Sequence, residues 1–477
     1  AGTAVTTGVK NTLIGGLAGD ALTEGVHNTV LGYNALSAED TGSYSVAIGS
    51  GALQDQNYNG AAFNVAVGYD AGTNVTTGIN NTIIGGLAGD ALTTGYSNVA
   101  IGRNALSTED TGRANVAIGY FALATQNSDT ANYNTAVGYA AGQNVTTGVQ
   151  NTIIGAEAGD ALTTGNHNIA IGFRALSTED TGSNSTAIGY YALNKQNDSN
   201  NMYNIAIGHS AGQEVTTGTN NVLLGGLTGS NITTGHHNIA IGTQALFTED
   251  AHGKNIAIGH NALKDQNAGT DAYNVAIGHE AGKQVTTGAQ NTIIGALAGD
   301  SLTTGGRNVA IGYNALTNED TTGYNVAVGY NALATQNASS NAFNVAVGYS
   351  AGIAITTGIY NVLLGGNAGA SLNTGNDNVL IGLNSGDSLT SGSANIAIGQ
   401  SALSSEDADG RNVAIGHATL QNQNAGQDAY NVAIGYSAGN DITTGIVNTM
   451  IGGLAGDALT TGSAHIAIGY QALSTED

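Results

Sequence analysis

Internal repetition constrains this chain more than any other feature of its sequence. Copies of the tetrapeptide Val-Thr-Thr-Gly lie 70 residues apart and begin at Val5, Val75, Val145, Val215 and Val285. Within each step a shorter motif recurs after 17, 17, 19 and 17 residues, and it consists of an Asn or Ser, three apolar or small residues and a Gly. Its Gly occurs 27 times, from Gly15 to Gly469. The chain is therefore a series of short units in a four-unit cycle.

Each unit predicts one coil of a parallel β-solenoid. The unit that begins at Asn98 opens with Asn-Val-Ala-Ile-Gly, and such a short β-rich run favours a strand over a helix. Alternation places Val and Ile on one side and Ala on the other, so we expect a strand buried on both faces. The Gly marks a corner, and a second short strand is expected after it, with an Ala three residues beyond the Gly. Pro is absent, as expected where every coil donates and accepts ladder hydrogen bonds.

We therefore expect an all-β chain in which residues 1–477 form one continuous β-solenoid of about 27 short coils. The segment at Ala1 aligns with the one at Ala71, so the region is expected to be cut within a repeat at both ends. One face of each strand can pack inside its coil, whereas the other needs a second chain. We therefore expect copies of the chain to associate symmetrically and to cover this second face.

Composition argues against several classes of partner. Only 9% of the residues are charged, yet the net charge is −24, because 34 Asp and Glu outnumber 10 Lys and Arg. No basic patch can form, so nucleic acid and anionic membrane surfaces are poor partners. The absence of Cys excludes disulfides and thiolate metal sites. No apolar run approaches the ~18 residues of a membrane span, so we expect no membrane insertion of this segment.

One stretch matches the G-x-S-x-G nucleophile elbow of α/β-hydrolases, Gly208 to Gly212, with Ser210 beside His209. The place of Ser210 is taken in the other cycles by Asp70, Ala140, Glu280, Ser350 and Ser437. The two glycines recur whatever lies between them, and a strand rather than a helix is expected next. We interpret Ser210 as a turn residue and expect no enzymatic activity.

Recurrent carboxylates raise the question of a calcium site. The candidates lie in the first and second units of the cycle and are Asp20, Glu39, Asp40, Asp90, Glu109 and Asp110. Ca²⁺ requires several oxygen ligands, which neighbouring coils could supply. Ser230 and Ala370 replace Asp20 in other cycles, so the position tolerates loss. We expect solvated acidic turns that keep the protein soluble, with calcium binding as the alternative and no other cofactor.

A column of aromatic or His residues follows the corner Gly. The members considered for surface binding are Tyr33, Tyr69, Tyr120, Tyr139, Tyr190, His209 and Tyr313. Such a column is expected to pack along the ladder, and its alternative role is to bind a glycan or another surface. The paired Thr residues suggest an ice-binding face, but they adjoin a Gly corner rather than a flat strand.

The Asn-Val-Ala-Ile-Gly units, with an Ala three residues after the Gly, resemble the head repeats of YadA-like trimeric autotransporter adhesins. Similar repeats occur in phage tail-fibre-like proteins, and the resemblance covers the whole chain. It implies a left-handed parallel β-roll in a homotrimer.

We therefore expect a non-enzymatic fibre on a cell or virion surface, outside the cell. It would present an adhesive face to a host surface, a glycan or a matrix component. A phage tail-fibre shaft and a self-assembling extracellular matrix filament are the alternatives, with an ice-binding solenoid as a minor one.

Overall fold

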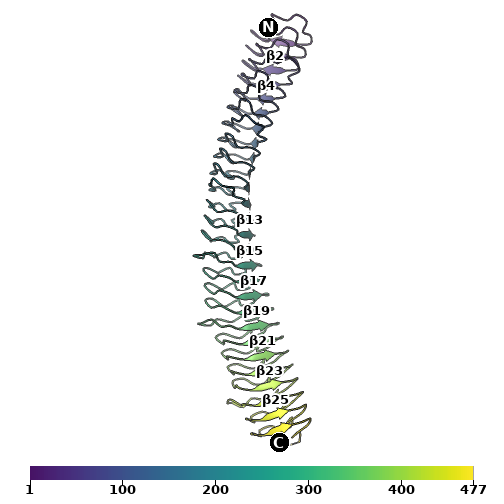
Figure 1. Cartoon of the computed structure of the whole chain (residues 1–477), viewed down its shortest axis with the longest axis vertical. Helices are drawn as coiled ribbons and strands as arrows, with labels where there is room; N and C mark the ends of the chain where they lie inside the picture. Colours follow the sequence, from purple (N-terminus) through teal and green to yellow (C-terminus); the bar gives the residue numbers. More distant parts are fainter. Residues whose placement is uncertain (476–477) are drawn as a thin grey trace. The chain divides into compact units, whose positions relative to one another are not determined.

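The computed structural model describes residues 1–475, and these belong to two compact units that divide between His237 and Asn238. In each unit the chain winds into coils, and every coil carries one strand of three residues (Figure 1). The described residues contain no α-helix, and none of them forms a helix that could cross a membrane. The prediction of an all-β parallel solenoid with about 27 coils is confirmed.

The first unit contains thirteen strands, which are β1 Thr12–Ile14, β2 Thr29–Leu31, β3 Val46–Ile48, β4 Val65–Val67, β5 Thr82–Ile84, β6 Val99–Ile101, β7 Val116–Ile118, β8 Thr135–Val137, β9 Thr152–Ile154, β10 Ile169–Ile171, β11 Thr186–Ile188, β12 Ile205–Ile207 and β13 Val222–Leu224. The second unit contains fourteen, which are β14 Ile239–Ile241, β15 Ile256–Ile258, β16 Val275–Ile277, β17 Thr292–Ile294, β18 Val309–Ile311, β19 Val326–Val328, β20 Val345–Val347, β21 Val362–Leu364, β22 Val379–Ile381, β23 Ile396–Ile398, β24 Val413–Ile415, β25 Val432–Ile434, β26 Thr449–Ile451 and β27 Ile466–Ile468.

Within each unit, every strand pairs in parallel with the strand of the next coil and without any shift of register. In the first unit β6 pairs with β7, so that Val99, Ala100 and Ile101 lie beside Val116, Ala117 and Ile118. Strands β18 and β19 of the second unit pair in the same way. Equivalent positions therefore stack into columns, and each side chain lies beside the side chain at the equivalent position of the neighbouring coil.

The strands are buried on one face only. The central residue points into the coil, and Ala100 and Ile83 are fully buried. The flanking residues point outward and remain partly exposed, as at Val99 and Ile101. One face is thus covered inside the coil, as expected, because a coil of about 17 residues encloses only one of the two faces. Burial of the other face by a second chain stays a prediction.

The second short strand expected after the corner does not form. Residues after Gly102 adopt turns, and Asn104 and Leu106 have φ values of 57° and 53°. Alternating left-handed residues prevent an extended run, so each coil closes through turns instead. The Ala three residues after the corner, Ala105 in this coil, is fully buried as the spacing predicts.

A column of Asn side chains ties the coils together from inside. The backbone N–H of Asn98 donates to Oδ1 of Asn81 at 2.9 Å, and its Nδ2 donates to the carbonyl of Gly112 at 2.9 Å. The N–H of Asn115 in turn donates to Oδ1 of Asn98 at 3.1 Å. Asn98 thus satisfies backbone groups of its own coil and of the next coil, so that these buried polar groups are paired rather than left at a cost in free energy.

Candidate functional site

The side chains directly after the corner glycines form what we call the corner ring column. All seven of its predicted members are exposed. Tyr120 stacks on Tyr139 with ring centroids 5.7 Å apart, and Tyr190 stacks on His209 at 5.3 Å. In the second unit Tyr313 stacks on Tyr330 at 5.4 Å. Packing along the ladder is confirmed for these pairs, and binding to a glycan or surface stays a prediction.

The corner ring column is interrupted at regular intervals. Ser50 occupies the coil between Tyr33 and Tyr69 and separates their rings. The first of the four short repeats in each cycle carries a Gly or Ala at this place, such as Gly86 or Ala156. The rings therefore form short exposed stacks rather than one unbroken stripe.

A second ring column was not predicted. It consists of the residues directly before the buried Asn or Ser that opens each strand motif. In the first unit Tyr44 stacks between His27 and Phe63, with centroid distances of 4.9 and 5.2 Å. In the second unit the guanidinium of Arg307 lies 5.2 Å from the ring centroid of Tyr324. The sequence does contain a pattern that indicates this column. An aromatic residue precedes the Asn that opens the fourth short repeat of each cycle, at Phe63, Tyr133, Tyr203, Tyr273, Phe343 and Tyr430.

A groove of about 470 Å³ lies along this second column in the second unit. Tyr273, Arg307 and Tyr324 line it, together with Asp271 and Asn341. Asp271 and Asn341 lie in the third of the four short repeats that make up a cycle, and this repeat is two residues longer than the others. Aromatic faces beside amide, guanidinium and carboxylate groups are suited to contact a polar ring such as a sugar.

The Glu-Asp pairs are not the solvated turns that the sequence suggested. Glu39 is fully buried, and its Oε1 accepts the N–H of Gly42 at 2.6 Å, while its Oε2 accepts Nε2 of Gln56 at 3.0 Å and the N–H of Tyr58 at 3.2 Å. Burial raises the pKa of Glu39 above its ordinary value. Asp40 is exposed. The expectation is wrong for the Glu because its side chain holds the turns of two coils together. The same burial is found at Glu109 and Glu179.

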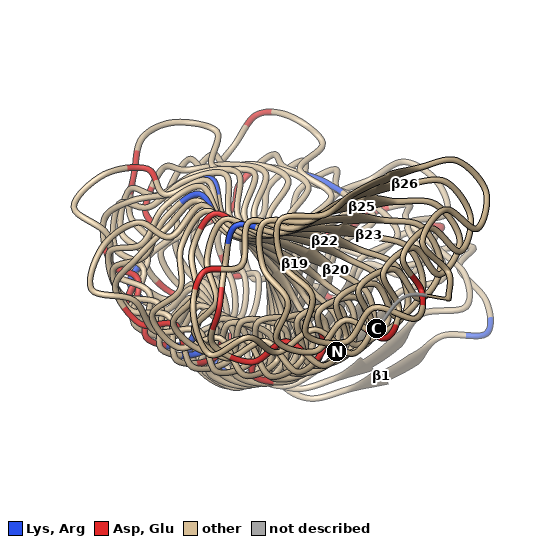
Figure 2. Ribbon diagram, turned by 90° about the horizontal axis from the view of Figure 1, so that it is seen from below, with Lys and Arg blue, Asp and Glu red and all other residues tan. Residues whose placement is uncertain are grey.

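The structure does not gather the calcium candidates into one cluster. Asp20 and Asp90 each keep a buried Oδ1 that has no hydrogen-bond partner among the described residues. Burial also raises the pKa of Asp90. In residues 1–475, however, none of the six candidates belongs to a group of three His, Asp or Glu side chains with ligand atoms close enough for one ion. Figure 2 shows the acidic residues on the turns, far more numerous than the basic ones.

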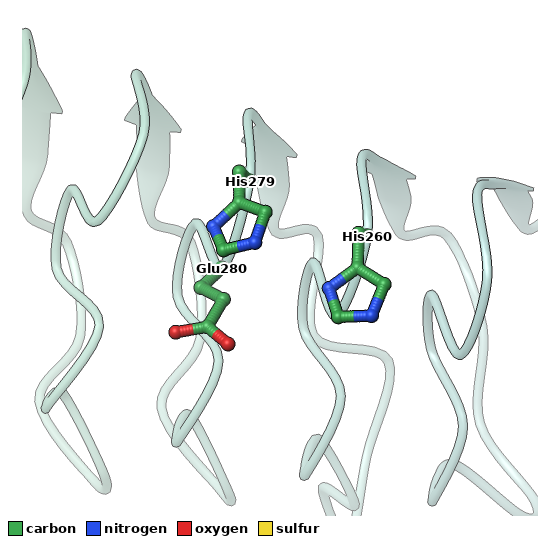
Figure 3. Close-up of side chains that lie close together, drawn as sticks. All are labelled: His260, His279 and Glu280. Atoms are coloured by element: carbon green, nitrogen blue, oxygen red, sulfur yellow. The ribbon is translucent and has the colours of Figure 1, made fainter.

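Two other clusters do bring three metal-ligating side chains together, both in the second unit. One consists of His260, His279 and Glu280, whose ligand atoms all lie within 4.8 Å of one another (Figure 3). The other consists of Glu249, Asp250 and His252. Burial raises the pKa of Glu249 to about 7, which makes it a poorer ligand at neutral pH.

Ser210 lies in a turn that continues without a helix. Its φ is 52°, its N–H donates to the carbonyl of Tyr190 at 2.8 Å, and the residue is nearly fully buried. His209 beside it points outward and stacks on Tyr190. The backbone context of a nucleophile elbow, a strand followed by a helix, is therefore missing here.

No protein-family model matches the chain, and no curated protein matches it at a significant level.

Proposed function

We propose that this chain is a segment of an extracellular fibrous protein that self-associates, as a homotrimer, and presents an adhesive surface. The outward face of the strands carries the proposal. In the first unit the strand positions that flank the buried centre are occupied by Val, Ile, Leu and Thr, and no strand carries a charged residue. Because the register is unshifted, these side chains line up over successive coils into one apolar stripe.

Such a stripe favours association with copies of the same chain. Ile84 and Ile154 are each 37% exposed, and Ile207 is 40% exposed. Contiguous apolar surface of this kind marks an interaction face in soluble proteins. A symmetric oligomer in which each chain turns its stripe toward a common axis buries all of the stripes at once. A trimer with left-handed coils is the arrangement that the resemblance implies.

The mass of the protein in solution tests this proposal. We expect light scattering to give three chains, and a stable monomer would refute the shared apolar face. Replacing Ile84 and Ile101 with Lys places two charges on the stripe without touching the coil interior, and should shift the mass toward one chain. Thr94→Lys, at an exposed turn of the same unit, is the matched control and should leave the mass unchanged.

The adhesive part of the proposal rests on the exposed rings and on the groove at Tyr273, Arg307 and Tyr324. Binding of the purified protein to immobilised glycans and to extracellular matrix components would test it. Tyr273→Ala and Tyr324→Ala each remove one aromatic face from the groove, and we expect each to weaken binding. Retention of full binding by the double variant would exclude this groove as the adhesive surface.

A further inference from the structure

Two imidazoles and a carboxylate meet on adjacent coils of the second unit. His260 follows the corner after β15, and His279 and Glu280 follow the corner after β16. The two strands pair in parallel without shift, so their corners lie side by side. One ligand atom from each of the three side chains lies within 4.8 Å of the other two, and Figure 3 shows the two imidazoles side by side on neighbouring coils with the Glu280 carboxylate below His279.

We propose that His260, His279 and Glu280 form a surface site for a divalent transition-metal ion of the Zn²⁺, Ni²⁺ or Cu²⁺ type. Neutral imidazole nitrogens suit these ions, and two nitrogens with a single carboxylate oxygen suit Ca²⁺ and Mg²⁺ poorly. The three donors leave further coordination positions, which face solvent because both His side chains are exposed.

The distances are compatible with small side-chain movements. Tetrahedral ligands at about 2.1 Å from an ion lie roughly 3.4 Å apart, so separations of at most 4.8 Å need to close by no more than about 1.4 Å. The imidazoles of His260 and His279 are stacked, with centroids 5.2 Å apart and an angle of 14° between the rings. Both rings are exposed and can tilt toward a shared ion without disturbing the coil interior.

Neighbouring groups keep the carboxylate charged. Nζ of Lys283 lies 3.1 Å from Oε1 of Glu280, and Nδ2 of Asn261 donates to the same oxygen at 3.3 Å. These partners lower the pKa of Glu280 below its ordinary value, with the Lys283 bond as the largest cause. The ion pair is partly exposed, and such pairs contribute little stability, so an incoming ion can displace the ammonium at small cost.

Other cycles show that the fold itself does not require these donors. The equivalents of His260, His279 and Glu280 are Tyr120, Tyr139 and Ala140 in one cycle, and Tyr330, Tyr349 and Ser350 in another. Tyrosine at both ring positions stacks well, as Tyr330 and Tyr349 do with centroids 5.4 Å apart. The chain therefore supplies its own fold-preserving substitutions for testing the site.

Titration of the untagged protein with Zn²⁺, and separately with Cu²⁺, tests the proposal by calorimetry at pH 7.5. We expect one ion per chain to depend on this cluster, with tighter binding of Cu²⁺ than of Zn²⁺. His260→Tyr and His279→Tyr should each weaken that binding by at least about tenfold, and Glu280→Ser should weaken it to a smaller extent. His209→Tyr, which replaces a corner-column His on another coil, should leave it unchanged.

The spectrum of bound Cu²⁺ gives a second measurement, which would not change if His260 and His279 had only a structural role. Nitrogen hyperfine structure from two imidazoles should appear in the electron paramagnetic resonance spectrum of the wild type. It should disappear in the His260→Tyr, His279→Tyr double variant while the circular dichroism stays the same. Absence of binding, or binding that survives in the folded double variant, would overturn the proposal.

Discussion

Gly85 and Gly86 are neighbours in one corner, but the coil needs only the first of them. Gly85 has a φ of +134°, and a Cβ at this position would lie 2.6 Å from the carbonyl carbon and oxygen of Gly102. Gly86 has no such φ, and the nearest atom to a Cβ there is the carbonyl oxygen of Tyr69 at 3.9 Å. The corner therefore demands glycine at one position and accepts a side chain at the next.

Alanine substitution should separate the two glycines. We expect Gly85→Ala to lower the free energy of unfolding by more than ~2 kcal/mol, because it combines a strained φ with a backbone clash. Gly86→Ala should be neutral or stabilising by about 0.5 kcal/mol, since it restricts the unfolded chain. Urea unfolding followed by circular dichroism measures both, and equal losses in the two variants would contradict the argument.

The buried Asn column marks the limit of what could be predicted at this scale. Asn is common in turns, and nothing in the sequence distinguishes Asn98 and its equivalents from exposed turn residues between coils. The structure instead buries Asn98, and its side chain reaches the carbonyl of Gly112, fourteen residues away. That contact depends on how the coil closes. Spacing could locate the Asn but could not reveal its partner.

At the scale of one coil, the central element is the turn around the buried Glu. In the first unit the residue three positions after this Glu is Gly, and a Cβ at Gly42 would lie 2.3 Å from the carboxyl of Glu39. In the second unit the equivalent positions carry His252, Thr322 and Asp409 instead. At Glu406 this brings two carboxyl groups together, since Asp409 is also buried. Equivalent turns in different cycles therefore bury either one or two carboxyl groups.

This arrangement predicts that the protein is more stable in mild acid than in base. Burial, followed by the charge of Asp409, raises the pKa of Glu406 from 4.5 to about 8. Between these values the folded state holds a proton that the unfolded state releases. Stability from this group is therefore fully present below pH 4.5 and is lost as the pH rises through 8. The slope is at most about 1.4 kcal/mol per pH unit for one group.

Thermal unfolding at pH 5, 7 and 9 measures this effect. Glu406→Gln keeps a neutral side chain of similar shape, so the loss of stability toward pH 9 should be smaller than in the wild type. Asp441→Asn, at an exposed turn of the same unit, should follow the wild-type profile. A wild-type midpoint that rises toward pH 9 would show that these carboxyl groups are ionised at little cost in the folded protein.

The elements themselves were predictable from the sequence to different degrees. The strand that begins at Val99 and the corner at Gly102 follow from the Asn-Val-Ala-Ile-Gly motif, because β-branched residues and a corner Gly are local signals. The turn through Asn104 and Leu106 was not predicted, since Leu rarely adopts a left-handed φ and does so here because the coil buries its side chain. The conformation of this turn depends on contacts between coils, which the local sequence pattern does not reveal.

At the scale of a whole unit, repetition makes neighbouring coils nearly interchangeable. In solenoids, each repeat contacts only its neighbours, and stability is approximately a sum of repeat and interface contributions. The first unit repeats its contacts after 70 residues. The N–H of Asn81 donates to Oδ1 of Asn64 at 2.9 Å, and the N–H of Asn151 donates to Oδ1 of Asn134 at 2.8 Å. One cycle can therefore be removed without leaving an unmatched junction.

Deletion of residues 81–150 should accordingly yield a folded protein. The deletion joins Asn80 to Asn151, and the N–H of Asn151 can then donate to Asn64 as that of Asn81 does in the intact chain. We expect unchanged circular dichroism per residue and a melting temperature within a few degrees of the wild type. Deletion of residues 81–154 is the control, because it also removes β9 and leaves the joined coil without its strand or its Asn. If both deletions unfold alike, contacts beyond neighbouring coils must stabilise the unit. If both fold alike, the strand and its Asn are not what holds a coil in place.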